Sequence, residues 1–232
     1  MNSFIWYDLM TAQKPEIVSF YEDVVGWKGG DSGVPGMDYT VLKAGGVMVA
    51  GMAPLSDDVS GMNPPWHGHI HSSDVDGDCR RVSAAGGKVH LPAADIPGIG
   101  RFAVVSDPGG ASFVLFKPDG SEQPASVAEG ATGHVGWREL HAHDLDKAWV
   151  FYEKLFGWKK AGDMPMPDGS TYQMFTTGKS GMDGAIMTMD KSTPQPMWLY
   201  YFNVGNIDEA AGRLLKGGGK LTETLLKYDD AQ

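Results

Sequence analysis

The sequence predicts an α+β protein built from tandem β-α-β-β-β units, and two features of the chain carry this prediction. The first is an internal repeat, in which a 23-residue block that begins at Trp6 matches a block that begins at Trp137 without a gap. The second is that strand-like hydrophobic runs alternate with segments of helical hydrophobic spacing in each copy. A long match at a fixed offset indicates a tandem duplication.

The repeat extends well beyond the first block. Phe20-Tyr21-Glu22 matches residues 151–153, and Gly26-Trp27-Lys28 matches residues 157–159, all at an offset of 131. Further along, Trp66 matches Trp198 at an offset of 132. Two collinear blocks at nearly the same offset are not expected by chance.

Each copy divides into strands and helices in the same order. In copy one the predicted strands are 4–10, 38–44, 47–52, 66–72, 88–92, 101–106 and 111–117, with helices at 15–25 and 74–85. In copy two the predicted strands are 136–142, 171–177, 184–189 and 197–204, with helices at 146–156 and 207–216. Copy two has no counterpart of the strands at 101–106 and 111–117, so its sheet is expected to be incomplete at the C-terminus.

A segment without periodicity separates the copies. Residues 117–134, KPDGSEQPASVAEGATGH, are rich in Pro, Gly, Ser and Ala, which is typical of a linker. We therefore expect a first domain at 1–118, a linker at 119–133, and a second, shorter domain at 134–232.

The composition and charge of the chain indicate which binding partners are not expected. The chain is 42% hydrophobic and 21% charged, as in ordinary globular proteins, and its formal net charge is −10. Nucleic acids and anionic membranes attract basic surfaces, so neither is an expected partner. No apolar run approaches the roughly 20 residues that span a bilayer, and no signal peptide is recognised. A single cysteine excludes a disulfide framework within the chain, and a cytoplasmic location is expected.

Residues 66–71 read WHGHIH, which places a histidine at every second position. If the stretch is a strand, His67, His69 and His71 share one face, because side chains alternate. The spacing alone leaves three interpretations open: a metal site, the lining of a wet cavity, or an outward, solvated face.

The order of elements and two motifs resemble one known superfamily. FYxxxxGW closes the first helix of each copy, and DPxGxxF at 107–113 forms a turn before a strand. Together they resemble the vicinal oxygen chelate superfamily of glyoxalases, bleomycin resistance proteins and extradiol dioxygenases, and most closely its tandem glyoxalase-like members. The resemblance implies that paired units form a curved eight-stranded cup, with the second cup incomplete. In metal-dependent members the cup holds a divalent ion through His and Glu.

Carried onto this sequence, the family's ligand positions are mostly filled by residues that do not bind metals. They fall on Trp6, His67 and Val114 in copy one, and on Trp137 and Leu199 in copy two. Only His67 is a metal-ligand type, whereas a catalytic ion needs two or three protein ligands. The standard metal site is therefore expected to be lost, and no cofactor is assured.

A rearranged metal site stays open as an alternative. Asp8 follows Trp6 by two residues and shares its predicted face, so Asp8, His67 and His69 would supply two histidines and a carboxylate. Such a set suits Fe, Mn or Zn, and Ni is also considered. The competing interpretation is that the imidazoles line a wet cavity.

Other side chains on the same predicted faces are candidates for chemistry or binding. We assign Asp8, Glu139 and His141 as candidate catalytic residues. Glu139 would act as a general base, its pKa raised by burial beside Trp137, unless Arg138, His141 or a backbone amide satisfies it. The candidate ligand-binding residues are Trp6, Trp137, His69 and His71.

Two classes of function remain open. The first is a glyoxalase-like enzyme, of lyase, isomerase or dioxygenase type, that binds a small organic molecule in a cup without the standard metal. The second is a metal-free protein of the bleomycin resistance kind that binds or sequesters a ligand. An incomplete sheet leaves an unpaired edge, so a homodimer that covers the second sheet is also considered.

Overall fold

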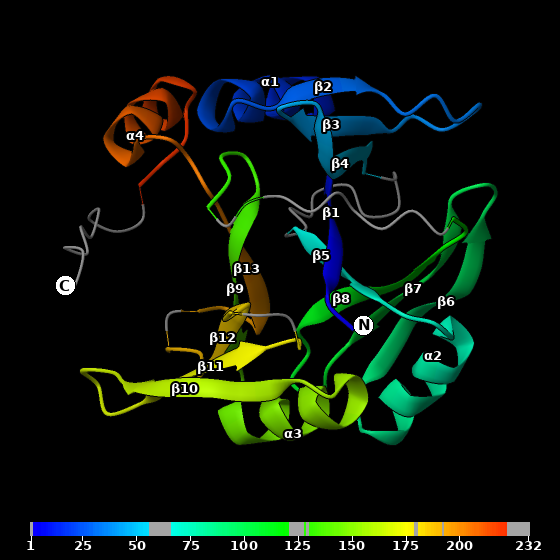
Figure 1. Cartoon of the computed structure of the whole chain (residues 1–232), viewed down its shortest axis with the longest axis vertical. Helices are drawn as coiled ribbons and strands as arrows, with labels where there is room; N and C mark the ends of the chain where they lie inside the picture. Colours follow the sequence, from blue (N-terminus) through cyan, green and yellow to red (C-terminus); the bar gives the residue numbers. More distant parts are fainter. Residues whose placement is uncertain are drawn as a thin grey trace.

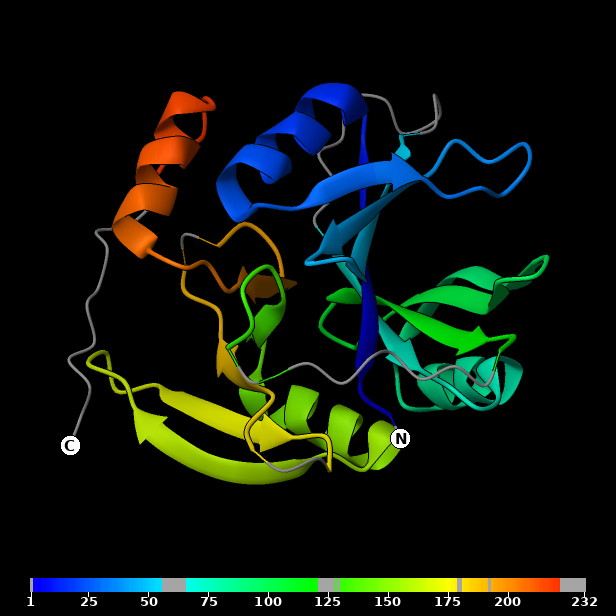
Figure 2. The same ribbon diagram turned by 45° about the horizontal axis from the view of Figure 1, so that its top comes forward.

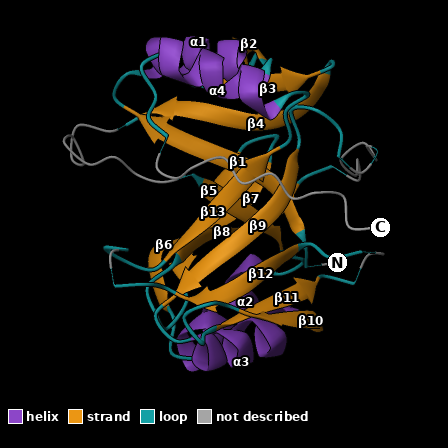
Figure 3. Cartoon of the chain, turned by 90° about the vertical axis from the view of Figure 1, so that its left-hand side faces the viewer, coloured by secondary structure: helices purple, strands orange, loops and turns teal. Residues whose placement is uncertain are grey.

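Two β-sheets form the centre of the protein, with helices at its two ends (Figure 3). The computed structural model describes residues 2–55, 66–120, 128, 130–178, 181–191 and 193–221. The first sheet has the strand order β2-β3-β4-β1-β5-β8-β7-β6, and the second has the order β10-β11-β12-β9-β13. This confirms the predicted α+β class and the smaller second sheet.

The elements follow the order that the repeat predicts. The strands of the first sheet are β1 (Phe4–Thr11), β2 (Lys28–Asp31), β3 (Thr40–Ala44), β4 (Val47–Pro54), β5 (His67–His71), β6 (Lys88–Ile96), β7 (Gly100–Ser106) and β8 (Ser112–Pro118). The strands of the second sheet are β9 (Val135–Ala142), β10 (Lys159–Pro165), β11 (Thr171–Thr176), β12 (Gly184–Thr188) and β13 (Met197–Phe202). The described helices are α1 (Lys14–Val25), α2 (Val75–Ala84), α3 (Leu145–Phe156) and α4 (Ile207–Lys216).

Two strands, β2 and β10, were not predicted from the sequence. Each lies at the outer edge of its sheet, and nearly all of their residues are exposed. They form because their backbones pair with β3 and β11, not because one face is buried. Hydrophobic periodicity reports burial, so it gives no signal for an edge strand of this kind.

Local sequence signals set the helix ends. The glycine of the FYxxxxGW motif ends α1 and α3 in the left-handed conformation, with φ of 86° at Gly26 and 70° at Gly157. At the N-termini of α2, α3 and α4, the side chains of Asp74, Asp144 and Asn206 accept hydrogen bonds from backbone N–H groups three residues ahead. These are the capping roles expected of Gly, Asp and Asn.

The last residue of the same motif ties the two copies together. Trp27 and Trp158 are completely buried. The indole N–H of Trp27 donates to the carbonyl of Gly133, at 2.7 Å, and that of Trp158 donates to the carbonyl of Asn2, at 2.8 Å. Gly133 and Asn2 are equivalent positions before the first strand of each copy, so each tryptophan binds the opposite copy.

The hydrophobic core is correspondingly shared. One cluster of buried side chains includes residues of both copies, among them Phe4, Phe113, Tyr152 and Trp198. The helices also pair across the copies, since α1 packs against α4 and α2 contacts α3 (Figures 1 and 2). The division of the chain into domains at 1–118 and 134–232, made from the sequence, stays a prediction.

The two sheets meet through side chains on the backs of β1, β5, β9 and β13. Arg138 Nε donates to the hydroxyl of Tyr7 at 2.7 Å, which joins β9 to β1. The backbone N–H of Gly68 donates to the hydroxyl of Tyr200, also at 2.7 Å, which joins β5 to β13. A Cβ at residue 68 would lie 2.5 Å from that hydroxyl, so only glycine allows this approach.

Within the part of the chain that the structure describes, no helix is long and apolar enough to cross a membrane. The predicted cytoplasmic location stays a prediction.

Candidate functional site

The face of the first sheet that carries Trp6 holds a group of four side chains, called cluster one: Trp6, Asp8, Tyr39 and His69. The indole N–H of Trp6 lies 2.7 Å from Asp8 Oδ1 and 2.7 Å from the hydroxyl oxygen of Tyr39. The hydroxyl of Tyr39 donates to the same Asp8 oxygen. His69 Nε2 lies 3.0 Å from Asp8 Oδ2, without hydrogen-bond alignment.

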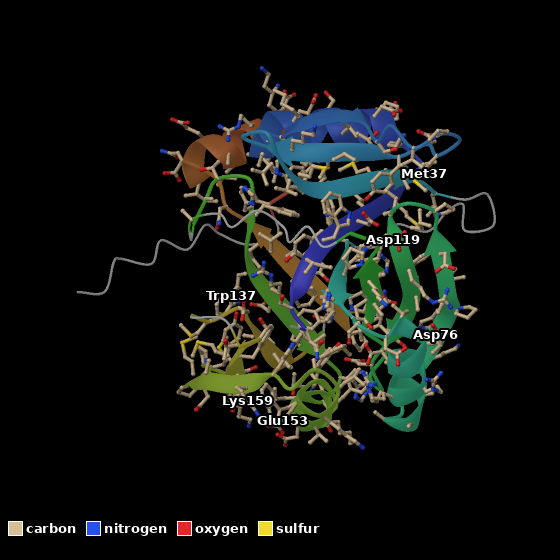
Figure 4. The ribbon with its side chains drawn as sticks, turned by 45° about the vertical axis from the view of Figure 1, so that its right-hand side comes forward. Met37, Asp76, Asp119, Trp137, Glu153 and Lys159 are labelled. Atoms are coloured by element: carbon tan, nitrogen blue, oxygen red, sulfur yellow. The ribbon has the colours of Figure 1, made fainter. Side chains whose placement is uncertain are left out.

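The second sheet carries a matching group, called cluster two: Trp137, Glu139, His141, Tyr172 and Tyr201. The indole of Trp137, which projects from β9 (Figure 4), donates to the hydroxyl of Tyr172 at 2.6 Å. That hydroxyl donates to Glu139 Oε2 at 2.6 Å, and Tyr201 donates to Oε1 at 3.1 Å. His141 Nε2 lies 2.7 Å from Glu139 Oε1, and it carries the proton because an ionised carboxylate only accepts.

The two clusters are equivalent by the repeat. Trp6 and Asp8 correspond to Trp137 and Glu139 on the first strand of each copy. The tyrosines at 39 and 172 also correspond, and His69 on β5 corresponds to Tyr201 on β13. His141 instead follows Glu139 on β9, at the position that Met10 takes in copy one.

The sequence did not reveal the three tyrosines, although it placed the carboxylates and tryptophans on the right faces. Tyr39 lies just before β3 and Tyr172 lies in β11, each well separated in sequence from the carboxylate that it bonds. A signal existed, because a tyrosine precedes a strand-like run at the same place in each repeat.

The pKa of Asp8 is lowered from its ordinary value. Burial by itself would raise the pKa, but the neighbouring His69 imidazole and the hydrogen bonds from Tyr39 and Trp6 outweigh this effect. Burial, together with the neighbouring Asp8 carboxylate, raises the pKa of the Tyr39 hydroxyl. Asp8 is therefore an ionised acceptor, and Tyr39 is a neutral donor.

Glu139 follows the alternative that the sequence left open: His141 satisfies the carboxylate, and its pKa is lowered and not raised. Burial beside the aromatic side chains by itself would raise the pKa, but hydrogen bonds from His141, Tyr172 and Tyr201 lower the pKa below its ordinary value. Three donors around one carboxylate stabilise its charge, so the glutamate stays ionised and is a weak base. Its proposed role as a general base loses its main support.

His67 and His69 of β5 lie on one face of the sheet, as the sequence predicts. His67 pairs in register with Asp8, and His69 pairs with Trp6 on the same face of the sheet. The ring of His67 lies 3.0 Å from the hydroxyl of Ser112, and burial and the neighbouring His69 lower its pKa. His69 is buried, and its Nδ1 has no hydrogen-bond partner among the described residues. The role of His71 in ligand binding stays a prediction.

A hollow of about 210 Å³ lies elsewhere, between the turn after β7 and the start of α3. Its acidic groups are already engaged: Asp107 accepts from the backbone N–H groups of Gly110 and Ala111, and Asp144 caps α3. We assign no function to this hollow.

Comparison with known proteins identifies the family. The model of the "Glyoxalase/Bleomycin resistance protein/Dioxygenase superfamily" matches residues 3–115 and again residues 132–231. The chain belongs to this superfamily. The two matches correspond to the two copies of the repeat, as the sequence predicted.

Curated relatives of this superfamily cover most of the chain. "Putative glyoxylase CFP32" of Mycobacterium tuberculosis is 31% identical over 219 residues, which is 93% of this chain and 82% of the relative. "Anthracycline biosynthesis protein DauV" of Streptomyces sp. is 30% identical over 235 residues, with the same two shares.

Solved structures share the superfamily fold at low identity. A Mn(II)-bound glyoxalase from Novosphingobium aromaticivorans has a TM-score of 0.60 at 19% identity, covering 93% of this chain and 70% of that one. The catechol dioxygenase BphC has a TM-score of 0.61 at 14% identity, covering 93% and 75%. At these identities the likeness concerns the fold alone.

At the family's ligand positions that the structure describes, the side chains do not fit the superfamily's metal chemistry. Val114, at the family's carboxylate position, is buried opposite His69 in the parallel pairing of β5 with β8. In copy two, Leu199 occupies the ligand position that is equivalent to His67, and it lies opposite Glu139 in the pairing of β13 with β9. Among the described residues, no three His, Cys, Asp or Glu side chains are grouped so that they could hold a metal ion. His67 as a metal ligand stays a prediction, and no chemical step is derived through a metal.

Proposed function

We propose that this chain binds a small organic molecule at clusters one and two, without a metal at the family position. The observation that carries the proposal is that the same tryptophan–tyrosine–carboxylate arrangement occurs at equivalent positions of both copies. The side chains of Asp8 and His141 are 24% and 16% exposed, so a ligand can reach both clusters. A purely structural network gains nothing from such exposure.

The composition of the clusters favours a flat ligand with hydrogen-bonding groups. Indole and phenol rings offer apolar area together with a polar edge, and each carboxylate is held ionised as an acceptor. The names of two relatives refer to anthracycline biosynthesis, and anthracyclines are planar aromatic compounds with hydroxyl groups. This supports the choice of quinizarin, a planar dihydroxyanthraquinone, as the first probe.

Calorimetric titration with quinizarin, in the presence of EDTA, tests the proposal. We expect saturable binding by the wild type. Asp8→Asn should weaken binding at cluster one about tenfold or more, and Glu139→Gln should do the same at cluster two, because each removes a charged acceptor. The matched controls are Asp119→Asn and Glu153→Gln, which change exposed carboxylates that belong to neither cluster (both are labelled in Figure 4) and should leave affinity unchanged. Equal affinity in all variants, or binding that EDTA abolishes, would contradict the proposal.

One contact favours a second candidate, an acid–base enzyme of lyase or isomerase type. Glu139 orients His141 through Nε2 at 2.7 Å, which is how a carboxylate prepares a histidine for proton transfer. In this role His141 Nδ1 would take a proton from a carbon next to a carbonyl, and the proton would return from water.

Exchange of deuterium from the α-carbons of deuterated dihydroxyacetone, followed by NMR with EDTA present, tests this candidate. Exchange above the buffer rate that is lost in His141→Gln supports it. Exchange that is no faster than buffer, or unchanged in the variant, contradicts it for this class of substrate.

A homodimer that covers the second sheet is part of the proposal. β13 is the outermost strand of that sheet within the described residues, and it has no charged side chain to protect its edge. Leu199 and Tyr201 are 37% and 48% exposed on it. Sedimentation velocity should find a dimer that Leu199→Lys weakens, and a monomer at all concentrations would exclude it.

A further inference from the structure

We propose that Gly51 is a positioning residue of cluster one, matched to the short side chain of Asp8, and that this pair makes the two ligand sites different. The inference deepens the proposed function and rests on it for the ligand. The positioning itself concerns only residues of this chain.

The first observation is the space beside Asp8. Gly51 on β4 is the register partner of Asp8 in the parallel pairing of β1 with β4. A Cβ at residue 51 would lie 1.7 Å from the hydroxyl oxygen of Tyr39 and 2.1 Å from the ring carbon that bears it. The phenol of Tyr39 therefore occupies the volume that any other side chain at this position would fill.

In copy two, a different pair of residues allows the tyrosine to reach the carboxylate. Ala185 on β12 is the register partner of Glu139 in the parallel pairing of β12 with β9. Its methyl group is completely buried, so the volume used by Tyr39 in copy one is filled here. Tyr172 nevertheless donates to Glu139 at 2.6 Å. The longer glutamate compensates, because its carboxylate lies one methylene further from the backbone.

The two pairs place their carboxylates differently. The side chain of Asp8 is 24% exposed, against 12% for that of Glu139. In cluster two, three donors surround the carboxylate closely, including Tyr201 and His141. The carboxylate of cluster one is therefore the more open of the two, and we expect it to bind a ligand with a donor group more tightly than cluster two does.

The matched pairs can be tested by exchange. Gly51→Ala should displace the Tyr39 ring, which can rotate because its far end makes the clash, and the bond to Asp8 should be lost. Asp8→Glu, added to Gly51→Ala, recreates the pair found in copy two and should restore the bond. The control is Gly30→Ala on β2, where a Cβ meets nothing within 4 Å.

The first readout needs no ligand. The indole N–H resonance of Trp6, assigned with Trp6→Phe, reports on the acceptors Asp8 and Tyr39. It should shift in Gly51→Ala, return toward the wild-type position in the double variant, and stay unchanged in Gly30→Ala. An unshifted resonance in Gly51→Ala, or no recovery in the double variant, would overturn the proposal.

The second readout is quinizarin affinity at cluster one, measured in a Glu139→Gln background. We expect a loss of about tenfold in Gly51→Ala and recovery to within about threefold in the double variant. Recovery of the resonance with no binding by any variant would reject the proposed function and keep the positioning role. Binding by the wild type with no recovery of either readout in the double variant would keep the proposed function and reject the positioning role.

If Gly51→Ala does not fold, the exchange in copy two gives the same test. Glu139→Asp should weaken the contact with Tyr172, and adding Ala185→Gly should restore it. The Trp137 indole resonance then serves as the reporter. Failure of Ala185→Gly to improve on Glu139→Asp would overturn the proposal.

Discussion

Cluster one and cluster two reach the same hydrogen-bond pattern with different side chains. Asp8 accepts from Tyr39 and contacts His69, whereas Glu139 accepts from Tyr172, Tyr201 and His141. The number of donors differs, as does the residue beside the carboxylate, but the pKa of each carboxyl group is lowered. The feature that the two copies share is therefore an ionised carboxylate that accepts a hydrogen bond from a tyrosine, and not a particular acid.

The clusters are also connected through the backs of their strands. Tyr7 lies between Trp6 and Asp8 on β1, and it bonds Arg138, which lies between Trp137 and Glu139 on β9. A side chain between two cluster residues points to the opposite face, so the contacts that join the sheets lie directly behind both clusters. Stability and site geometry therefore depend on the same four strands.

The largest effect is expected from the core, and it tests whether the copies are separable. Trp27→Ala and Trp158→Ala should each cost about 3–5 kcal/mol of unfolding free energy, because each removes a completely buried ring and its bond to the opposite copy. Thermal unfolding by calorimetry should show one shifted transition in either variant. Val150→Ala, on an exposed site of α3, is the control. A variant that melts in two steps would show that each copy has a core of its own.

An intermediate effect is expected from the contacts between the sheets. Arg138→Met leaves the buried Tyr7 hydroxyl without its donor, and Tyr200→Phe leaves the Gly68 N–H without its acceptor. Each should cost about 1–3 kcal/mol, which urea denaturation can measure. The Trp6 and Trp137 indole resonances should move together in Arg138→Met. Movement of one resonance alone would show that the clusters are positioned independently.

The smallest effect is the contribution of the carboxylates to stability in acid. Both have a lowered pKa in the folded state, so their contribution is complete above the unfolded-state values of 3.8 for Asp8 and 4.5 for Glu139. It is lost as the pH falls through the lower folded-state values. Urea denaturation from pH 6 to pH 2 should show a shallower loss of stability in Asp8→Asn and in Glu139→Gln than in the wild type. Glu153→Gln is the control, and identical slopes in all proteins would refute the lowered pKa values.

Much of the fold could be predicted because its signals are local. The repeat placed the elements of copy two, glycines and capping residues set the helix ends, and alternation placed His67 and His69 on the face of Asp8. The edge strands β2 and β10 could not be predicted, because they form by backbone pairing with neighbours and bury no side-chain face.

The candidate site divides in the same way. The sequence by itself determined that a tryptophan and a carboxylate share one face of the first strand in each copy, because period-two alternation fixes that geometry. Only the tertiary structure decided that Tyr39 and Tyr172 complete the clusters. It also decided that His69 with Tyr39, and His141 with Tyr172, lower the pKa values of Asp8 and Glu139. Those tyrosines are more than 30 residues away from the carboxylates, and the approach of Tyr39 depends on Gly51 on a neighbouring strand. Long-range packing of this kind leaves no periodic trace in the sequence.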